Sequence, residues 1–149
     1  MKTLILGYGN TLRKDDGLGI YAVQALASTA LPADVEILAC QQLSPELSVT
    51  LAHAERAIFI DAALAADGET PGTIKTRKLH PRTSQPSGIT HHFDPETLLA
   101  MAQTLYGHAP DAILFCVVSS DFELEEGLSP AVSQALPDLI SQVRQSIYS

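Results

Sequence analysis

The sequence predicts an α/β fold, a three-layer α/β/α sandwich with a mainly parallel five-stranded sheet. Apolar segments of strand length alternate with helical segments along the whole chain. This order is typical of a parallel sheet that is covered by helices on both faces. The segment 56–61 is apolar on both faces, as expected of a central parallel strand. The 149 residues suffice for one core and leave little room for a second, so we expect a single domain over residues 1–149.

The first half of the chain is predicted to contribute three strands and two helices. An apolar run opens the chain, and two glycines end it before a segment with the apolar periodicity of a helix. Ser44, Pro45 and Glu46 have the pattern of a helix start, with Ser as the N-cap and Pro at the first helical position. The expected strands are 2–7, 35–39 and 56–61, and the expected helices are 16–29 and 44–54.

The second half of the chain is predicted to contribute the remaining two strands and two helices. Polar and apolar residues alternate over 73–79, which favours a half-exposed or edge strand. The segment 81–90 contains two prolines and small polar residues, so we expect a long irregular loop, and such loops are often functional. The remaining elements are a helix over 94–106, a strand over 112–118, an acidic loop over 119–127 and a last helix from 129 to the C-terminus.

Composition argues against two classes of partner. The net charge of −8 disfavours binding to nucleic acid, which needs a clustered positive surface. No apolar run is long enough to span a membrane, and Met1-Lys2-Thr3 leads straight into a predicted strand without a signal peptide. We therefore expect a cytoplasmic protein. Cys40 and Cys116 are isolated in apolar runs, which predicts buried free thiols rather than a disulfide or a zinc site.

A glycine-containing turn after the first strand allows two interpretations. A glycine loop between a strand and a helix can bind a phosphate, but Leu12 stands where the dinucleotide fingerprint requires its last glycine. The following Asp15 and Asp16 would also repel a pyrophosphate. In the second interpretation, the glycines shape the turn and the two carboxylates cap the helix. A second Asp is more than a cap requires, which is the first indication of a site.

Candidate site residues follow two strands and the long loop. Asp16 lies past the first strand and Asp61 ends the third, so the two carboxylates share one edge of the sheet if these strands are neighbours. Asp61 alternatively accepts hydrogen bonds from its own turn. His91 and His92 end the loop, and carboxylates with an imidazole suit nickel or zinc. The other histidines are expected at the surface: His53, His80 and His108. No Gly-x-Ser-x-Gly motif is present, which disfavours covalent catalysis.

Several segments together resemble the nickel–iron hydrogenase maturation endopeptidases. Leu6-Gly7-Tyr8-Gly9-Asn10-Thr11-Leu12 followed by Asp15-Asp16-Gly17-Leu18-Gly19 is similar to their first motif, Phe59-Ile60-Asp61-Ala62 to the second, Thr90-His91-His92 to the third, and Gly127-Leu128-Ser129-Pro130 to the start of their last helix. The motifs occur in the right order over nearly the whole chain, and the first is the most specific.

This resemblance implies a metal-dependent endopeptidase with an α/β/α fold. The substrate would be the nickel-loaded precursor of a hydrogenase large subunit, from which the enzyme removes a C-terminal peptide. The resemblance implies Asp16, Asp61 and His91 as the catalytic and metal-contacting residues. Nickel would be supplied by the substrate, with no permanently bound metal in the protease, and we expect a monomer. The spacing to the following Leu-rich helix favours His91 over His92 as the ligand.

Two other functions are compatible with these residues, and the sequence differs from the family pattern at two places. The same ligands would serve a non-enzymatic chaperone that checks for nickel, and the glycine turn leaves a nucleotide-binding α/β protein as the other alternative. Many members of the resembled family have Glu where this chain has Asp16, which shortens the reach of the carboxylate. The segment 119–126 lacks a Gly-x-x-Pro-like turn that is common in the family, which bears on the choice of partner.

Overall fold

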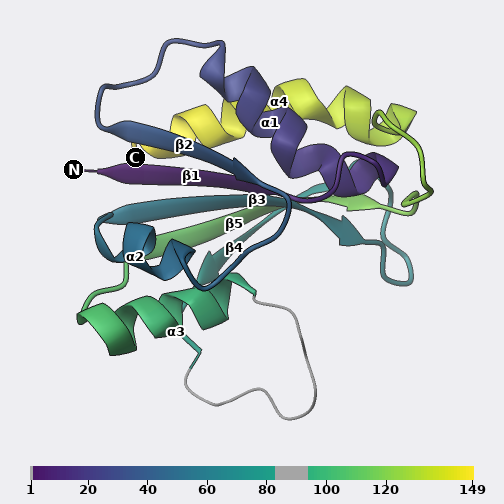
Figure 1. The fold of residues 1–149 in the computed structure, drawn as a ribbon. Helices are drawn as coiled ribbons and strands as arrows, with labels where there is room; N and C mark the ends of the chain where they lie inside the picture. Colours follow the sequence, from purple (N-terminus) through teal and green to yellow (C-terminus); the bar gives the residue numbers. More distant parts are fainter. Residues whose placement is uncertain (1, 83–93) are drawn as a thin grey trace.

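The computed structural model describes residues 2–82 and 94–149, and its strands form a single sheet (Figure 1). The strands are β1 (Thr3–Tyr8), β2 (Val35–Cys40), β3 (Arg56–Leu64), β4 (Ile74–Leu79) and β5 (Asp111–Ser119). Their order is β2-β1-β3-β5-β4. The pairs β1–β2, β1–β3 and β3–β5 are parallel, and only the edge strand β4 is antiparallel to its neighbour among the described strands. The predicted α/β fold with a mainly parallel five-stranded sheet is therefore confirmed.

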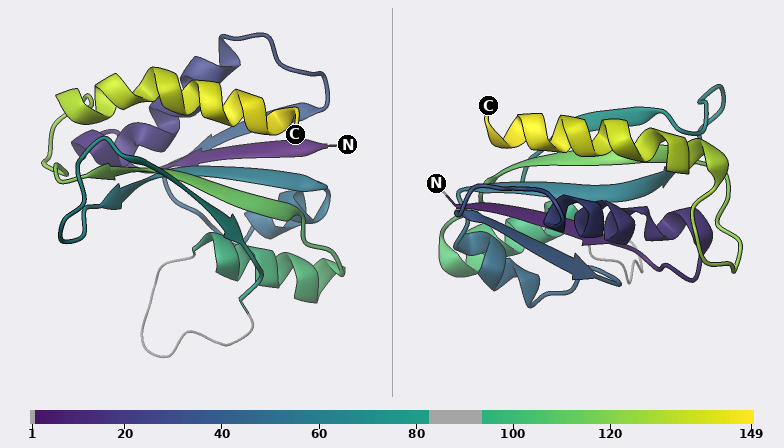
Figure 2. Two further views of the ribbon diagram at one scale, coloured as in Figure 1. Left: turned by 180° about the vertical axis from the view of Figure 1, so that it is seen from behind. Right: turned by 90° about the horizontal axis from the view of Figure 1, so that it is seen from above.

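Helices cover both faces of the sheet and complete three layers. They are η1, a 3₁₀ turn (Lys14–Gly17), and the α-helices α1 (Leu18–Ala27), α2 (Leu47–Ala52), α3 (Pro95–Tyr106) and α4 (Pro130–Ile147). In the two views of Figure 2, α1 and α4 lie on one face, and α2 and α3 lie on the other. None of the helices in the described part of the chain is long and apolar enough to cross a membrane.

The core forms two clusters because successive strand residues point to opposite faces. Leu4 and Leu6 pack toward α2 and α3, whereas Ile5 packs toward α1 and α4. In β3, Phe59 belongs to the first cluster and Ile60 to the second. All five side chains are completely buried. The middle residues of the central strands are apolar because both faces of these strands are covered, as the sequence predicted.

The exposed strand β4 confirms the predicted edge. Its residues 75–78 are exposed, and three of the four carry a basic side chain. Charged residues on an edge strand disfavour pairing with strands of other molecules. Among the described strands, β4 pairs with β5 alone, so it is an edge of this sheet.

Several details differ from the sequence predictions. Strand β3 runs three residues beyond Asp61, because β5 continues beside it to the pair Leu64↔Ser119. Helix α2 begins at Leu47 instead of residue 44, and the residues before it form a turn in which Leu47 N–H bonds Ser44 O at 3.1 Å. Cys40 and Cys116 are free thiols as predicted, but they are half-buried rather than buried.

The first predicted helix is also divided. It starts with the 3₁₀ turn η1, and α1 begins only at Leu18, with Gly17 as its N-cap and no side-chain cap. Asp15 and Asp16 therefore do not cap α1, which corrects the simpler interpretation of these carboxylates. Each has a separate hydrogen-bonding role.

Asp94 links the start of α3 to the chain before residue 83. Its carboxylate accepts a hydrogen bond from Thr97 N at 2.7 Å and forms an ion pair with Arg82. We expect Asp94→Ala to lower the free energy of unfolding by about 1 to 2 kcal/mol, because the first turn of α3 loses its N-cap. Asp94→Ser is the matched control, because serine restores the cap without the ion pair. Equal loss of stability in both variants, measured by urea denaturation, would assign the effect to Arg82 instead.

Candidate active site at the carboxyl edge of the sheet

A cleft of about 740 Å³ lies at the end of β1, beside Asp61 of β3. Its lining comes from segments that are far apart in sequence: Tyr8, Gly9, Asn10, Arg13, Asp16, Gln41, Gln42, Leu43, Ser44, Pro45, Asp61, Arg77, Asp94, Pro95, Glu96 and Leu114. Ligands of open α/β sheets bind beyond the carboxyl ends of the parallel strands. The cleft occupies this position and contains both carboxylates that the sequence predicted for a shared edge.

At the carboxyl edge of the sheet, the apolar face under α2 and α3 is followed by polar residues that line the cleft. Leu6 and Phe59 pair in register and are completely buried beneath these helices. Two residues further along each strand, on the same face, stand Tyr8 and Asp61, which are partly buried. In β5, Cys116 is the registered partner of Asp61. The row that follows the core therefore carries a phenol, a carboxylate and a thiol side by side.

Asp61 lies inside a strand that is paired with β5 both before and after it, so its backbone position is fixed by β5. Its Oδ1 accepts a hydrogen bond from Ala62 N at 2.8 Å. Asp61 is therefore a local acceptor, but within β3 and not in the turn that the sequence-based alternative expected. Burial raises the pKa of Asp61 to about 7. The bond from Ala62 and the interaction with the Tyr8 hydroxyl lower this pKa, and the negative charge of Asp16 raises it. A carboxyl with a pKa in this range exists in both protonation states near neutral pH.

Tyr8 is a site residue that sequence reasoning did not select. Burial and the neighbouring Asp61 raise the pKa of its phenol well above the usual range, so the hydroxyl stays protonated. A protonated hydroxyl can donate to the carboxylate of Asp61 and thereby favours the charged form of that group. The sequence could have indicated this residue, because side chains alternate between the two faces of a strand. Tyr8 therefore lies on the same face of β1 as Leu4 and Leu6.

Asp16 reaches the cleft from η1 and is held by the loop that precedes it. Its Oδ2 accepts a hydrogen bond from Asn10 N at 2.9 Å. Gly9 has φ +137°, and a Cβ at this position would lie 1.8 Å from Asp16 O. The glycine is therefore required by close packing of the loop against η1. This contact accounts for the glycine turn without a bound phosphate.

Charged residues of both signs surround the two carboxylates. The guanidinium of Arg77 donates to Glu96 Oε1 from both of its terminal nitrogens, each at 3.2 Å. Arg13 also lines the cleft and is exposed. Sequence reasoning did not identify the pair of Arg77 and Glu96, because their meeting depends on the antiparallel return of β4 beside β5.

Predictions about the histidines have different outcomes. His91 and His92 lie outside the described residues, so their assignment stays a prediction. His53, His80 and His108 are exposed, as predicted. Within residues 2–82 and 94–149, no three His, Cys, Asp or Glu side chains are grouped closely enough to hold a metal ion.

Comparisons with known proteins agree with this architecture. A family model described as hydrogenase maturation protease matches residues 20–146. The Hydrogenase 2 maturation protease of Escherichia coli (strain K12) is 29% identical over 149 residues, covering 96% of this chain and 88% of that protein. The hydrogenase expression/formation protein HupD of Rhodobacter capsulatus is 40% identical over 78 residues, which are 52% of this chain and 36% of that protein.

Solved structures show the same fold. The hydrogenase maturating endopeptidase HybD from E. coli superimposes with a TM-score of 0.82 at 27% identity, covering 99% of this chain and 93% of that chain. The [NiFe] hydrogenase maturation protease HycI from Thermococcus kodakarensis KOD1 has a TM-score of 0.78 at 20% identity, again covering 99% and 93%. The second likeness concerns the fold alone.

The fold and the cleft at the sheet edge place the protein among α/β enzymes that bind their substrates beyond the ends of parallel strands. With the family match over most of its length, the chain belongs to the hydrogenase maturation proteases. It is therefore an endopeptidase, and the non-enzymatic chaperone and the nucleotide-binding protein have no support from these relatives.

The raised pKa of Asp61 makes stability depend on pH. The folded state retains the proton of Asp61 up to about pH 7, whereas the unfolded chain releases it near pH 4. Asp61 therefore destabilises the wild-type fold progressively as pH rises from about 4 to 7. We expect Asp61→Asn to be no more stable than wild type at pH 4 and about 1 to 4 kcal/mol more stable at pH 8.

Urea denaturation across this pH range, with a chelator present, measures the difference. Asp67→Asn is the matched control, because Asp67 is an exposed carboxylate in the loop after β3. A pH profile of Asp61→Asn that runs parallel to those of wild type and Asp67→Asn would contradict the assigned burial of Asp61.

Proposed function

We propose that this protein is a metal-dependent endopeptidase that removes the C-terminal peptide from the nickel-loaded precursor of a nickel–iron hydrogenase large subunit. Asp16, Asp61 and His91 contact the nickel, which the substrate supplies, and the protease holds no permanent metal of its own. We further propose that residues 1–149 form one domain and act as a monomer in the cytoplasm. Membership of the hydrogenase maturation proteases supports the kind of substrate.

The observation that carries the proposal is the meeting of two carboxylates in one cleft. Asp61 comes from the middle of the sheet and Asp16 from the turn after the neighbouring strand, and both line the same cavity. The charge of Asp16 acts on the pKa of Asp61, so the two groups are close enough to interact. Two carboxylates supply hard oxygen ligands that attract a divalent cation.

The position of Asp94 supports a histidine from the segment 83–93 as the third ligand. Asp94 lines the cleft and follows His91 by three residues in the sequence. Arg82, which precedes the undescribed segment, pairs with Asp94 and donates its backbone N–H to Glu96 O at 3.1 Å. The chain therefore enters and leaves the segment 83–93 at the border of the cleft. An imidazole added to two carboxylates completes a mixed nitrogen and oxygen set that suits nickel.

Asp61 also has the properties of a proton-transfer group. A carboxyl with a pKa near the working pH can accept a proton from an attacking water and pass it to the departing amine. Nickel in the substrate would polarise the same water or the scissile carbonyl. A site with so few ligands binds a metal ion only weakly in the free protease. The substrate must therefore bring the nickel, and peptide cleavage follows nickel insertion.

Removing either carboxylate charge tests the proposal. We expect Asp16→Asn and Asp61→Asn each to abolish cleavage of the nickel-loaded precursor, because the amide keeps the shape of the side chain and removes a charged ligand. Asp67→Asn should cleave at the wild-type rate. The shortened large subunit is followed by gel electrophoresis and mass spectrometry, and circular dichroism verifies folding.

The same assay includes metal-free precursor as a second substrate. Wild-type protease should leave it uncut. Cleavage of metal-free and nickel-loaded precursor at equal rates would contradict a role for nickel. A wild-type rate in either carboxylate variant would remove that residue from the site.

The two adjacent histidines are distinguished by single substitutions. We expect His91→Ala to stop cleavage and His92→Ala only to slow it, because adjacent residues of an extended segment point to opposite sides and only one can face the carboxylates. Rates are measured with nickel-loaded precursor at saturating concentration. An active His91 variant beside an inactive His92 variant would reverse the assignment, and full activity in both would rule out a histidine ligand from this pair.

A further inference from the structure

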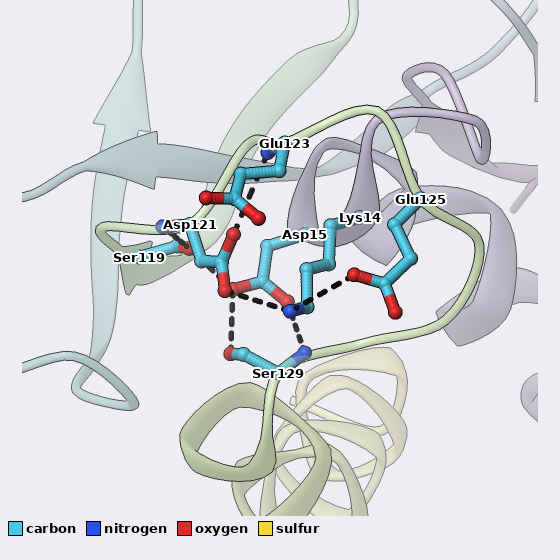
Figure 3. Close-up of polar contacts among 7 residues, drawn as sticks. All are labelled: Lys14, Asp15, Ser119, Asp121, Glu123, Glu125 and Ser129. Carbon is cyan, nitrogen blue, oxygen red and sulfur yellow. Dashed lines mark hydrogen bonds and ion pairs between the residues drawn. The ribbon is translucent and has the colours of Figure 1, made fainter.

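Asp15 is a completely buried carboxylate directly beside Asp16, and the proposed chemistry does not use it. Its Oδ1 accepts a hydrogen bond from Ser129 N at 2.7 Å, and its Oδ2 accepts one from Ser129 Oγ at 2.6 Å and another from Ser119 Oγ. Ser119 ends β5, and Ser129 precedes the first residue of α4 (Figure 3). One carboxylate therefore joins η1 to two elements that are more than one hundred residues away in sequence.

A second set of contacts reinforces this connection. Lys14 Nζ lies 2.8 Å from Asp121 Oδ2 and 3.5 Å from Glu125 Oε2 (Figure 3). Backbone bonds run beside these ion pairs, from Lys14 N to Glu125 O at 2.8 Å and from Asp15 N to Asp121 O at 3.3 Å. These bonds and ion pairs hold the loop between β5 and α4 against η1. We call the three-residue contact of Asp15, Ser119 and Ser129 the serine anchor.

The backbone of η1 is arranged so that adjacent carboxylates point in opposite directions. Lys14 has φ +48°, a left-handed conformation that costs about 1 kcal/mol or more for a residue with a side chain. After this residue, Asp15 turns into the interior and Asp16 turns to the cleft. Strained residues persist when surrounding contacts over-determine them. The ion pairs and the backbone bond of Lys14 supply such contacts directly, and the serine anchor holds the next residue, Asp15.

Asp16 itself has few restraints. The one hydrogen bond of its carboxylate within the described part of the chain is that from Asn10 N. The direction of this side chain therefore depends on the position of η1, which Asp15 fixes from the opposite side. Misplacement of a reacting group by about 1 Å can reduce an enzymatic rate about a hundredfold.

We propose that Asp15 is a positioning residue, which holds the carboxylate of Asp16 in its cleavage-competent position through Ser119 and Ser129. This inference rests on the proposed role of Asp16. Asp15 contacts neither the substrate nor the metal, and its effect on the reaction passes through η1. The side chain of Asp15 suits this task because its two oxygens accept all three hydrogen bonds at once.

The central experiment compares Asp15→Asn with a core substitution far along α4 from the serine anchor. Asparagine keeps the volume of the side chain but replaces one acceptor oxygen by an NH₂ donor, which conflicts with the donors facing it. Val143→Ala is the control, because Val143 is completely buried in α4 and lies about 21 Å along the helix from Ser129 by the helical rise. Both variants are assayed with nickel-loaded precursor below their melting temperatures.

We expect Asp15→Asn to lower kcat at least about tenfold with little change in KM. The carboxylate of Asp16 would lose its orientation, while the residues that line the cleft remain in place. Val143→Ala should keep kcat within about twofold of wild type. Hydrogen exchange of the Asn10 amide, measured by NMR, should accelerate in Asp15→Asn more than in the control, because this amide binds Asp16. Equal kcat values and equal Asn10 exchange rates in the two variants would overturn the proposal.

Serine variants keep the test decisive if Asp15→Asn does not fold. Ser119→Ala and Ser129→Ala each remove one hydroxyl donor, and we expect each to reduce kcat, whereas Ser129→Thr retains the hydroxyl and should restore it. Unchanged kcat in both alanine variants would overturn the positioning role. Asp16→Asn in the same assay separates the two proposals. If it is inactive while the anchor variants are fully active, only the positioning role fails; if it is active, the proposed site fails and the positioning role fails with it.

Discussion

The parallel pairing of β1 with β3 is the constraint on which the candidate site depends. It aligns Gly7 with Ile60, so that the residues that follow meet at one edge of the sheet. Tyr8 and Asp61 then stand in the same row, and the turn after β1 returns Asp16 to the same cleft. Nothing in the local sequence of either strand creates this meeting. It arises because two segments about fifty residues apart are both apolar enough to be central strands.

Much of this arrangement was predictable from the pattern of residue types. Alternating strands and helices, and the double-sided apolar character of 56–61, are by themselves enough to indicate an α/β fold. The placement of Asp16 and Asp61 on one edge followed from a general rule about where parallel strands end. The start of α3 at Asp94 was also apparent, because Asp-Pro-Glu is a strong local signal for a helix start.

The remainder depended on tertiary contacts that a single sequence does not display. The extension of β3 to Leu64 comes from the length of β5, a strand about fifty residues later. Arg77 reaches Glu96 only because β4 runs antiparallel to β5. Asp15 resembled a helix cap, since a carboxylate before an apolar helix usually is one. Its actual partners, Ser119 and Ser129, lie more than one hundred residues away.

The position of Asp61 inside β3, rather than at its end, has a thermodynamic consequence for recognition. The strand is hydrogen-bonded to β5 before and after this residue, so folding has already removed the conformational entropy of its backbone. A partner that binds at Asp61 does not have to order this part of the cleft again, and the corresponding unfavourable entropy is absent from the association step. The backbone of Asp61 is thus pre-organised at the cleft before any partner arrives.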